Sequence, residues 1–240
     1  AVYSFMDSAI IGRSGSFTVK NYVYLFHSED LRSMIFGTLI LAVIVAVIST
    51  ILGTLGAIGA FYSSKKLKRP IHLMNQIPVV NADVVTGFSI CVLLIVFFKM
   101  DKASYIPLVI GLVSLCSPFV YLSVIPRLKQ MDPQLYEAAL DLGCSSFGAL
   151  RKVVLPQLTS GIVSGFMMSI TLTLDDYFIT TYTKPSMFDT ISTYVVNATK
   201  GAQTDVKTAL WALSTIIFLI VIFVVIGMNH TGRKENDHEI

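Results

Sequence analysis

Five long runs of apolar residues, separated by shorter polar stretches, dominate the chain. A helix needs about 20 apolar residues to cross a bilayer, and each run is long enough. Because an open strand leaves its backbone polar groups unsatisfied in lipid, the runs predict helices. The pattern therefore predicts an all-α integral membrane protein with a bundle of five visible transmembrane helices. The expected spans are Met34–Tyr62, Val79–Phe98, Tyr105–Ile125, Gly161–Thr183 and Leu210–Met228.

Composition indicates the same class of protein. Of the 240 residues, 54% are hydrophobic and 14% are charged, whereas soluble domains carry about 25% charged residues. Membrane lipid is therefore the expected surrounding, and the net charge of +3 gives no reason to expect a nucleic-acid partner. The cysteines and histidines are scattered without metal-ligand spacing, so we expect no metal site. We expect residues 1–240 to form a single transmembrane domain.

Basic residues in the short loops predict the orientation. A dense cluster, Lys65–Arg69, lies between the first two spans, and loops rich in lysine and arginine stay in the cytoplasm. If the spans alternate, the segment between the third and fourth spans and the carboxyl terminus are cytoplasmic too. The amino end is then outside, which implies a preceding helix and six spans in the full protein. We interpret residues 1–6 as the remnant of that helix; the alternative, a signal peptide, lacks a basic start and a cleavage site.

The expected cytoplasmic segment, residues 127–158, contains signals for two short helices. Asp132-Pro133 suits a helix start, since Asp caps free backbone N–H groups and Pro fits the first helical position. The first helix is expected to run to Leu142 and to end at Gly143. A second helix is expected to end near Pro156, capped by Ser145 or Ser146. From this pattern alone, an amphipathic hairpin on the membrane surface explains the segment as well as a docking element does.

The same segment resembles the EAA loop of ABC-importer permeases. The family pattern is E-A-A-x3-G-x9-I-x-L-P, and the one departure is Val153, where the family has Ile. The resemblance implies the type I ABC importer permease fold and a cytoplasmic coupling helix that docks on a separate ATPase. The matching positions, which the resemblance assigns to ATPase coupling, are Glu137, Ala138, Ala139, Gly143, Leu155 and Pro156.

The resemblance also implies a role for several of these residues. Glu137 would make a polar contact with the ATPase, and Gly143 would set the turn after the helix. Ala138 and Ala139 would permit close approach. The chain has no G-x-x-x-x-G-K-[ST] loop, so it is expected to be a transport subunit and not an enzyme. ATP and Mg would be bound by an ATPase dimer, and no cofactor is expected in this chain.

Two adjacent acids, Asp175 and Asp176, lie within the fourth expected span. A carboxylate at the bilayer centre costs about 2.5–3.5 kcal/mol on insertion scales, so such acids are functional by default. The structural alternative is an acid bonded to a neighbouring helix. On a continuous helix Asp175 is turned about 100° from Asp176. We therefore expect Asp176 to face a transport path and Asp175 to lie at its margin or to support a helix contact. The polar stripe with Asp176 is Ser169, Thr173, Asp176, Thr180 and Thr183.

Carboxylates with aromatic neighbours suit a small cationic solute through ion pairing and cation–π attraction. Asn81 and Asp83, near the start of the second span, fit either a helix cap or a substrate contact. The expected substrate-binding residues are Asp176, Asp175, Tyr177, Thr173 and Thr180, with Tyr182 as a further aromatic candidate.

The run Ser-x-x-Leu-x-Leu-Asp-Asp at residues 169–176 resembles the permeases of spermidine/putrescine importers, as do the stretches at 126–129 and 197–213. That resemblance implies a polyamine cargo, a second permease subunit, two ATPase subunits and an extracytoplasmic substrate-binding protein. It also implies a multi-pass protein of the inner or plasma membrane. Related permeases for iron, thiosulfate and phosphonate have similar scaffolds, so these cargoes remain alternatives.

Two other classes of function compete with the importer. A proton-coupled secondary transporter would explain a buried acid, but not the EAA spacing, and no inverted repeat is visible. An intramembrane aspartyl protease needs two acids that converge on one proton. Neighbouring acids on one helix point apart, which disfavours the protease.

Overall fold

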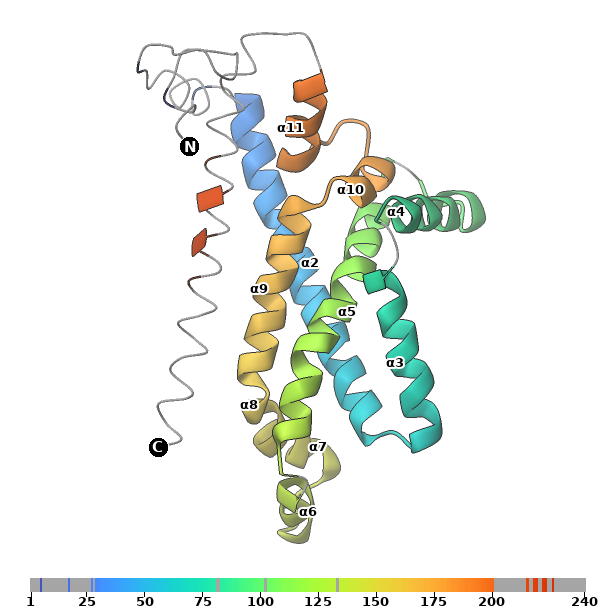
Figure 1. Cartoon of the computed structure of the whole chain (residues 1–240), viewed down its shortest axis with the longest axis vertical. Coiled ribbons are helices and arrows are strands. Elements are labelled where there is room, and N and C mark those ends of the chain that lie inside the picture. Colours follow the sequence, from blue (N-terminus) through green and yellow to red (C-terminus); the bar gives the residue numbers. More distant parts are fainter. Residues whose placement is uncertain are drawn as a thin grey trace. The chain divides into compact units, whose positions relative to one another are not determined.

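The computed structural model describes residues 29–80, 83–101, 103–132 and 134–200, together with a few isolated residues elsewhere in the chain. Every element in these ranges is a helix (Figure 1), which confirms the all-α prediction. The helices are α2 (Glu29–Tyr62), α3 (Lys65–Val80), α4 (Asp83–Cys91), the π-helix η2 (Val92–Phe97), α5 (Ile106–Gln130), α6 (Gln134–Asp141), α7 (Ser146–Ala149), the π-helix η3 (Leu150–Val154), α8 (Leu155–Gln157), α9 (Thr159–Asp175), α10 (Phe178–Thr183) and α11 (Ile191–Lys200).

Two described helices are long and apolar enough to cross a membrane. They are Leu31–Tyr62 within α2 and Ile106–Gln130, which is α5, and they match the first and third expected spans. A third candidate is Ser146–Gln157 with Thr159–Asp175, a pair bent by 70°. The fifth expected span, Leu210–Met228, falls outside the described ranges except for isolated residues, so the total number of spans stays a prediction.

The second expected span, Val79–Phe98, is wrong as one continuous helix. Helix α3 ends at Val80, α4 begins at Asp83, and η2 follows directly. The basic cluster Lys65–Arg69 lies in α3 instead of a turn. Hydropathy identifies helices that suit lipid. It does not reveal that a polar stretch such as Lys65–Arg69 is also helical. Asn and Asp favour helix starts over helix interiors, which suits a new helix at this point.

The fourth expected span, Gly161–Thr183, is also interrupted. Helix α9 ends at Asp175 and α10 begins at Phe178. The predicted polar stripe has residues 4, 3, 4 and 3 positions apart, which share one face only on a straight helix. Because α9 ends at Asp175, the predicted stripe is wrong beyond that residue.

The described residues pack as two compact units. One comprises described residues within 1–44, 83–112 and 171–225, and the other comprises those within 45–82, 113–170 and 226–240. Each unit therefore contains part of α2, α5 and α9. That residues 1–240 act as one transmembrane domain stays a prediction.

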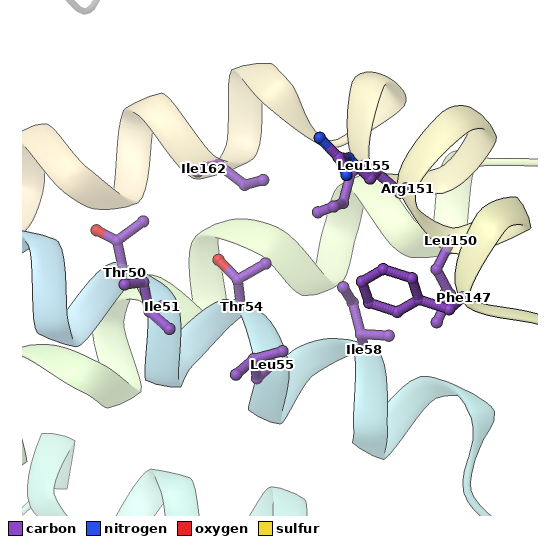
Figure 2. Close-up of a pocket in the computed structure, with 10 residues that line it drawn as sticks. All are labelled: Thr50, Ile51, Thr54, Leu55, Ile58, Phe147, Leu150, Arg151, Leu155 and Ile162. Carbon is purple, nitrogen blue, oxygen red and sulfur yellow. The ribbon is translucent and has the colours of Figure 1, made fainter.

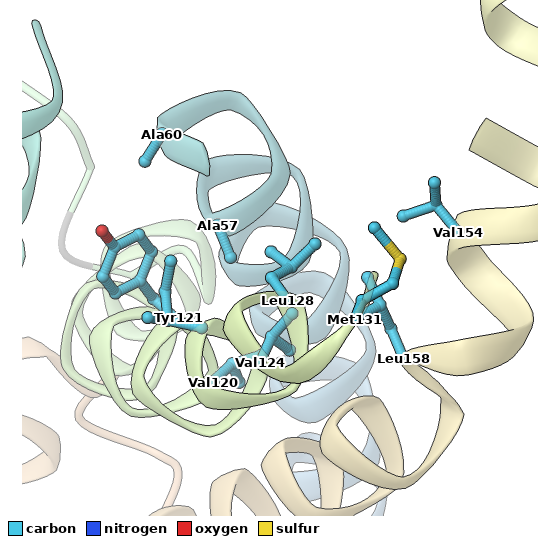
Figure 3. Close-up of a cluster of buried hydrophobic side chains, with 10 residues drawn as sticks. Ala57, Ala60, Val120, Tyr121, Val124, Leu128, Met131, Val154 and Leu158 are labelled. Carbon is cyan, nitrogen blue, oxygen red and sulfur yellow. The ribbon is translucent and has the colours of Figure 1, made fainter. Parts of the chain in front are cut away.

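The core of the second unit is a cluster of buried apolar side chains from α2, α5 and the segment before α9 (Figure 3). Helix α5 runs through its centre, and Val154 and Leu158 meet it from the segment before α9. Each residue in the cluster is at most 7% exposed, so the cluster is closed to solvent. Its members are Ala57, Ala60, Val120, Tyr121, Val124, Ile125, Leu128, Met131, Val154 and Leu158.

Glycines let the backbones in this unit approach closely. A Cβ added to Gly53 of α2 would lie 2.6 Å from Cβ of Val120 and 2.8 Å from the carbonyl oxygen of Ser117, both on α5. A Cβ added to Gly165 of α9 would lie 3.1 Å from Cα of Val120. Small residues at helix contacts are typical of membrane bundles, and here they bring α2 and α9 against α5.

The first unit has a contact of the same kind between α4 and α10. A Cβ added to Gly87 of α4 would lie 3.1 Å from Cα of Ile179 on α10. The ring of Phe88 meets that of Tyr182 edge-on, with centroids 5.9 Å apart. At the start of α11, the N–H of Ile191 donates to Oγ1 of Thr38 on α2.

We expect Gly53→Val to destabilise the protein by about 1–3 kcal/mol, because the added methyl groups would overlap α5. Thermal unfolding of the detergent-purified protein measures the effect. Gly59→Val is the matched control, since a Cβ at Gly59 meets nothing within 4 Å. Equal stability of the two variants would contradict the close contact of α2 with α5.

Candidate functional site

The predicted coupling helix is α6, and both of its ends form as the sequence predicts. At the start, Oδ1 of Asp132 accepts a hydrogen bond from the N–H of Gln134 at 2.9 Å. At the end, Gly143 has a φ of +84°, in the left-handed region. The N–H of Gly143 bonds to the carbonyl of Leu140, and the N–H of Cys144 bonds to that of Ala139. These two bonds define a Schellman motif, in which Gly relieves the strain of positive φ.

The second helical stretch begins with α7, and its N-cap is Ser145, one of the two predicted capping residues. Its hydroxyl accepts a hydrogen bond from the N–H of Gly148 at 3.2 Å. The stretch continues through α7, η3 and α8, and Leu158 follows it before α9 begins. Val154 and Leu158 are both fully buried in the core cluster (Figure 3). The segment 134–158 is therefore anchored to α5 and α2 and is not a loose connector.

The residues of the EAA pattern are divided between surface and interior. Glu137 and Ala138 are exposed, as are Leu155 and Pro156, whereas Ala139 is 6% exposed and packs within the chain. Of the two alanines that the resemblance assigns to close approach, Ala138 is therefore the one accessible to a partner. Helix α6 also exposes apolar side chains, since Leu135 is 40% and Leu142 85% exposed. Exposed apolar side chains beside a carboxylate form a surface suited to docking.

Sequence reasoning missed an aromatic contact beneath this surface. The ring of Tyr136 on α6 lies against that of Tyr62 at the end of α2, with centroids 4.9 Å apart. Tyr136 stands directly before the E-A-A triplet, but no periodicity signals a partner 74 residues earlier. The contact gives α6 a second attachment to the membrane helices, besides the core cluster.

The two adjacent acids lie at the interruption between α9 and α10, and their environments differ. Asp175 is exposed, and its backbone carbonyl accepts a hydrogen bond from the Ser192 hydroxyl at 3.2 Å. Asp176 is 9% exposed. One oxygen of Asp176 accepts two hydrogen bonds from Thr180, from its N–H and its hydroxyl, both at 2.8 Å.

Asp176, the residue before the N-cap Tyr177, therefore supplies a side-chain acceptor to the first turn of α10. The first N–H groups of any helix lack partners within that helix, and lipid offers them no water. The carboxylate supplies an acceptor, and a negative charge is favourable at this end of a helix. The carboxylate of Asp176 thus stabilises the helix that follows the interruption, and Asp175 is the acid exposed at the surface of the described chain.

The remaining residues of the expected polar stripe are buried. Ser169 and Thr183 each donate their hydroxyl to a backbone carbonyl four residues earlier, Gly165 and Ile179 respectively. Thr173 is 2% exposed and Thr180 is fully buried. None of these side chains lines an open surface of the described chain, and their role in binding substrate stays a prediction.

The aromatic candidates divide in a similar way. Tyr182 packs on Phe88, whereas Tyr177 is partly exposed beside Asp175 and contacts Phe178, with ring centroids 5.2 Å apart. Asp83 is the first residue of α4, and Asn81 lies outside the described residues. In the part of the chain that the structure describes, no group of three or more potential metal ligands occurs.

Known proteins resemble the chain along most of its length. Residues 50–232 match the family described as "Binding-protein-dependent transport system inner membrane component". The chain is 28% identical to the spermidine/putrescine transport system permease protein PotC of Escherichia coli (strain K12), over 91% of this chain and 81% of that protein. It is 27% identical to the putrescine transport system permease protein PotI of the same strain, over 90% and 78%.

Solved structures share the fold. A chain of the bacterial alginate ABC transporter, in complex with an alginate pentasaccharide-bound periplasmic protein, superposes with a TM-score of 0.70 at 18% identity, over 91% of this chain and 83% of that one. A chain of the MetNI methionine ABC transporter gives 0.66 at 14% identity, over 86% and 98%. The type I ABC importer permease fold is thereby confirmed.

The family match covers most of the chain and includes α6 and both acids. It makes the protein a multi-pass component of the inner membrane in a transport system that depends on a binding protein. The chain belongs to the family of binding-protein-dependent transport system inner membrane components.

Proposed function

We propose that the chain is the permease subunit that carries polyamines, spermidine or putrescine, through an ATP-driven importer. The observation that carries the proposal is the similarity to PotC and PotI, both named for these cargoes, over at least 90% of this chain. The exposed carboxylate of Asp175 in an apolar segment gives the cargo a chemical partner. Polyamines are cations, and a carboxylate outside bulk water binds a cation more strongly than one at an aqueous surface does.

Helix α6 is the proposed contact with the ATPase. Glu137, Ala138 and Leu142 present a carboxylate, a small residue and an apolar side chain on its exposed surface. A partner docked there would act on α2 and α5 through Tyr136 and through the core cluster around Val154. Nucleotide-driven closure of two ATPase subunits would then move these helices as rigid bodies and alternate access to the cargo.

The remaining partners follow from the same proposal. A second permease subunit completes the transport path, two ATPase subunits bind ATP and Mg, and an extracytoplasmic protein delivers the cargo. No cofactor is proposed in this chain. The α6 segment and the carboxyl terminus lie in the cytoplasm, in accordance with the basic cluster Lys65–Arg69 and the positive-inside rule.

For the cargo, Asp175 is the proposed primary contact, with Tyr177 beside it. Asp176 and Thr180 position this region by capping α10, and Thr173 lies buried one turn before the acids. This assignment exchanges the two roles expected from the sequence, since the exposed acid is Asp175 and not Asp176.

Glu137→Lys is expected to lower ATP-driven polyamine uptake about tenfold or more, because a charge-assisted contact with the ATPase is lost. Uptake into vesicles that contain the complete complex measures it, with membrane insertion checked by immunoblot. Gln130→Lys is the control, since Gln130 is exposed at the end of α5 outside the EAA pattern. Normal uptake by the Glu137 variant would refute the coupling role.

Asp175→Asn is expected to raise the polyamine concentration for half-maximal uptake about tenfold or more, with unchanged thermal stability. Asp176→Ala should instead lower the stability by about 1 kcal/mol, because the α10 cap is lost. Asp176→Asn keeps an acceptor oxygen and should restore most of that stability. If Asp175→Asn leaves uptake unaffected while Asp176→Asn abolishes it, the original assignment of the path to Asp176 is correct.

Cys144 reports the orientation, because it is partly exposed directly after α6. A membrane-impermeant maleimide should label it in inverted vesicles and not in right-side-out ones, and bound ATPase should slow the reaction. The Cys144→Ser variant shows how much of the label is taken up by the other two cysteines, Cys91 and Cys116. Labelling from the outer side would show that the α6 segment is not cytoplasmic.

A further inference from the structure

An open pocket of about 490 Å³ lies in the second unit, between α2 and the helical stretch that leads to α9 (Figure 2). Its volume falls in the range of about 300–1,000 Å³ that small-molecule sites occupy. One wall is the α2 surface from Thr50 to Ile58, and the opposite wall comes from α7, η3, α8 and the start of α9. The lining residues are Thr50, Ile51, Thr54, Leu55, Ile58, Phe147, Leu150, Arg151, Leu155 and Ile162.

Most of the lining is aliphatic, and several of these side chains are open to the surroundings. Ile51 is 55%, Leu55 is 62% and Phe147 is 74% exposed. Ile51 and Leu55 belong to a helix long and apolar enough to cross a membrane, so lipid chains are their natural neighbours. A flexible hydrocarbon chain can follow such a wall, whereas a polar solute gains little from it.

Arg151 distinguishes this pocket from a general apolar groove. It is exposed, and within the described part of the chain no carboxylate forms an ion pair with it. Figure 2 shows its guanidinium beside Leu155, across the pocket from α2. A guanidinium binds a phosphate through two parallel hydrogen bonds. Basic pockets between membrane helices on the cytoplasmic side suit anionic lipid head groups.

Two threonines of α2 give the pocket's inner wall a polar component. Thr50 is 9% and Thr54 is 6% exposed, and both hydroxyl oxygens are buried without a hydrogen-bond partner in the part of the chain that the structure describes. A buried hydroxyl without a partner costs about 1–3 kcal/mol, so rotation of either side chain toward an acceptor in the pocket is favourable. The ester oxygens between the phosphate and the acyl chains of a phospholipid are acceptors of this kind.

We propose that the pocket binds one anionic phospholipid of the cytoplasmic leaflet. Its phosphate pairs with Arg151, its ester region lies near Thr50 and Thr54, and one acyl chain packs along Ile51 and Leu55. The choice of leaflet rests on the proposed function, which places α6–α8 in the cytoplasm. A second permease or another part of this chain could also cover an apolar groove, but a guanidinium without an ion pair among the described residues favours a phosphate.

The test uses the full complex of both permeases and the ATPase in phosphatidylcholine vesicles with a trace of photoactivatable phosphatidylglycerol. Crosslinked peptides are mapped by mass spectrometry. We expect labelling of residues 50–58 and 147–162, reduced about fivefold by Arg151→Gln, in line with the attraction of one basic residue to anionic lipid. Lys152→Gln removes the adjacent cation, which does not line the pocket, and should retain labelling.

A second pair of variants tests the acyl chain. Leu55→Trp fills the pocket and should suppress labelling, whereas Leu52→Trp adds the same ring to an exposed position of α2 outside the lining and should not. Equal labelling by photoactivatable phosphatidylcholine, or undiminished labelling of Arg151→Gln, would overturn the anionic site. If no lipid labels the pocket and a protein segment crosslinks to its lining instead, that segment occupies the pocket. This outcome would also overturn the proposal.

The two proposals fail separately. Crosslinking needs neither cargo nor ATP, so an error about polyamines leaves it unchanged. Polyamine uptake measured on the same vesicles identifies that case, because uptake would be absent while the lipid label persisted.

Discussion

Backbone N–H and carbonyl groups in lipid have no water to bond, so each must find a partner within the protein. Long helices meet this requirement internally, but the interruption between α9 and α10 does not. There the carboxylate of Asp176 accepts the N–H and the hydroxyl of Thr180. Hydroxyls along the same helices donate back to their own backbone, as at Ser169 and Thr183. The acid that the sequence assigns to the cargo path thus has a bonding role in the local fold.

The neighbouring acid, Asp175, has a different environment. Asp175 is the last residue of α9, and it is exposed, whereas Asp176 is buried and bonded to Thr180. Tyr177 lies beside it, partly exposed. The two adjacent carboxylates therefore differ in environment, since one is bonded to the first turn of α10 and the other is exposed.

The segment proposed for coupling has a different requirement, since that role needs an exposed docking surface which also transmits force. Its caps at Asp132 and Ser145 and its turn at Gly143 fix the helices locally. Val154 and Leu158, both fully buried, fix them to α5. A surface held in this way moves together with the helices behind it, because close-packed interiors deform little.

Sequence predicted the parts of this arrangement that depend on local chemistry. Hydropathy located α2 and α5, and the types of residue at Asp132, Gly143 and Ser145 located the ends of the coupling helices. The sequence did not predict the interruption of the fourth span, because 3.6-residue periodicity assumes a continuous helix. At that interruption the side chain of Asp176 bonds to the next turn. Sequence also missed the contact of Tyr62 with Tyr136 and the pocket at Arg151, because both join segments far apart in the chain.

The contact of α4 with α10 has a consequence for how this region can vary among related sequences. Cβ atoms at Gly87 and Gly111 would lie 3.1 Å from Cα and 2.9 Å from Cγ2 of Ile179, respectively. Replacement of Gly111 can be accommodated by a smaller residue at 179, because the obstructing atom belongs to that side chain. A Cβ at Gly87 meets backbone, so it requires α4 and α10 to separate by a few tenths of an ångström. Position 111 can therefore vary together with position 179, whereas a change at position 87 alters the spacing of the two helices.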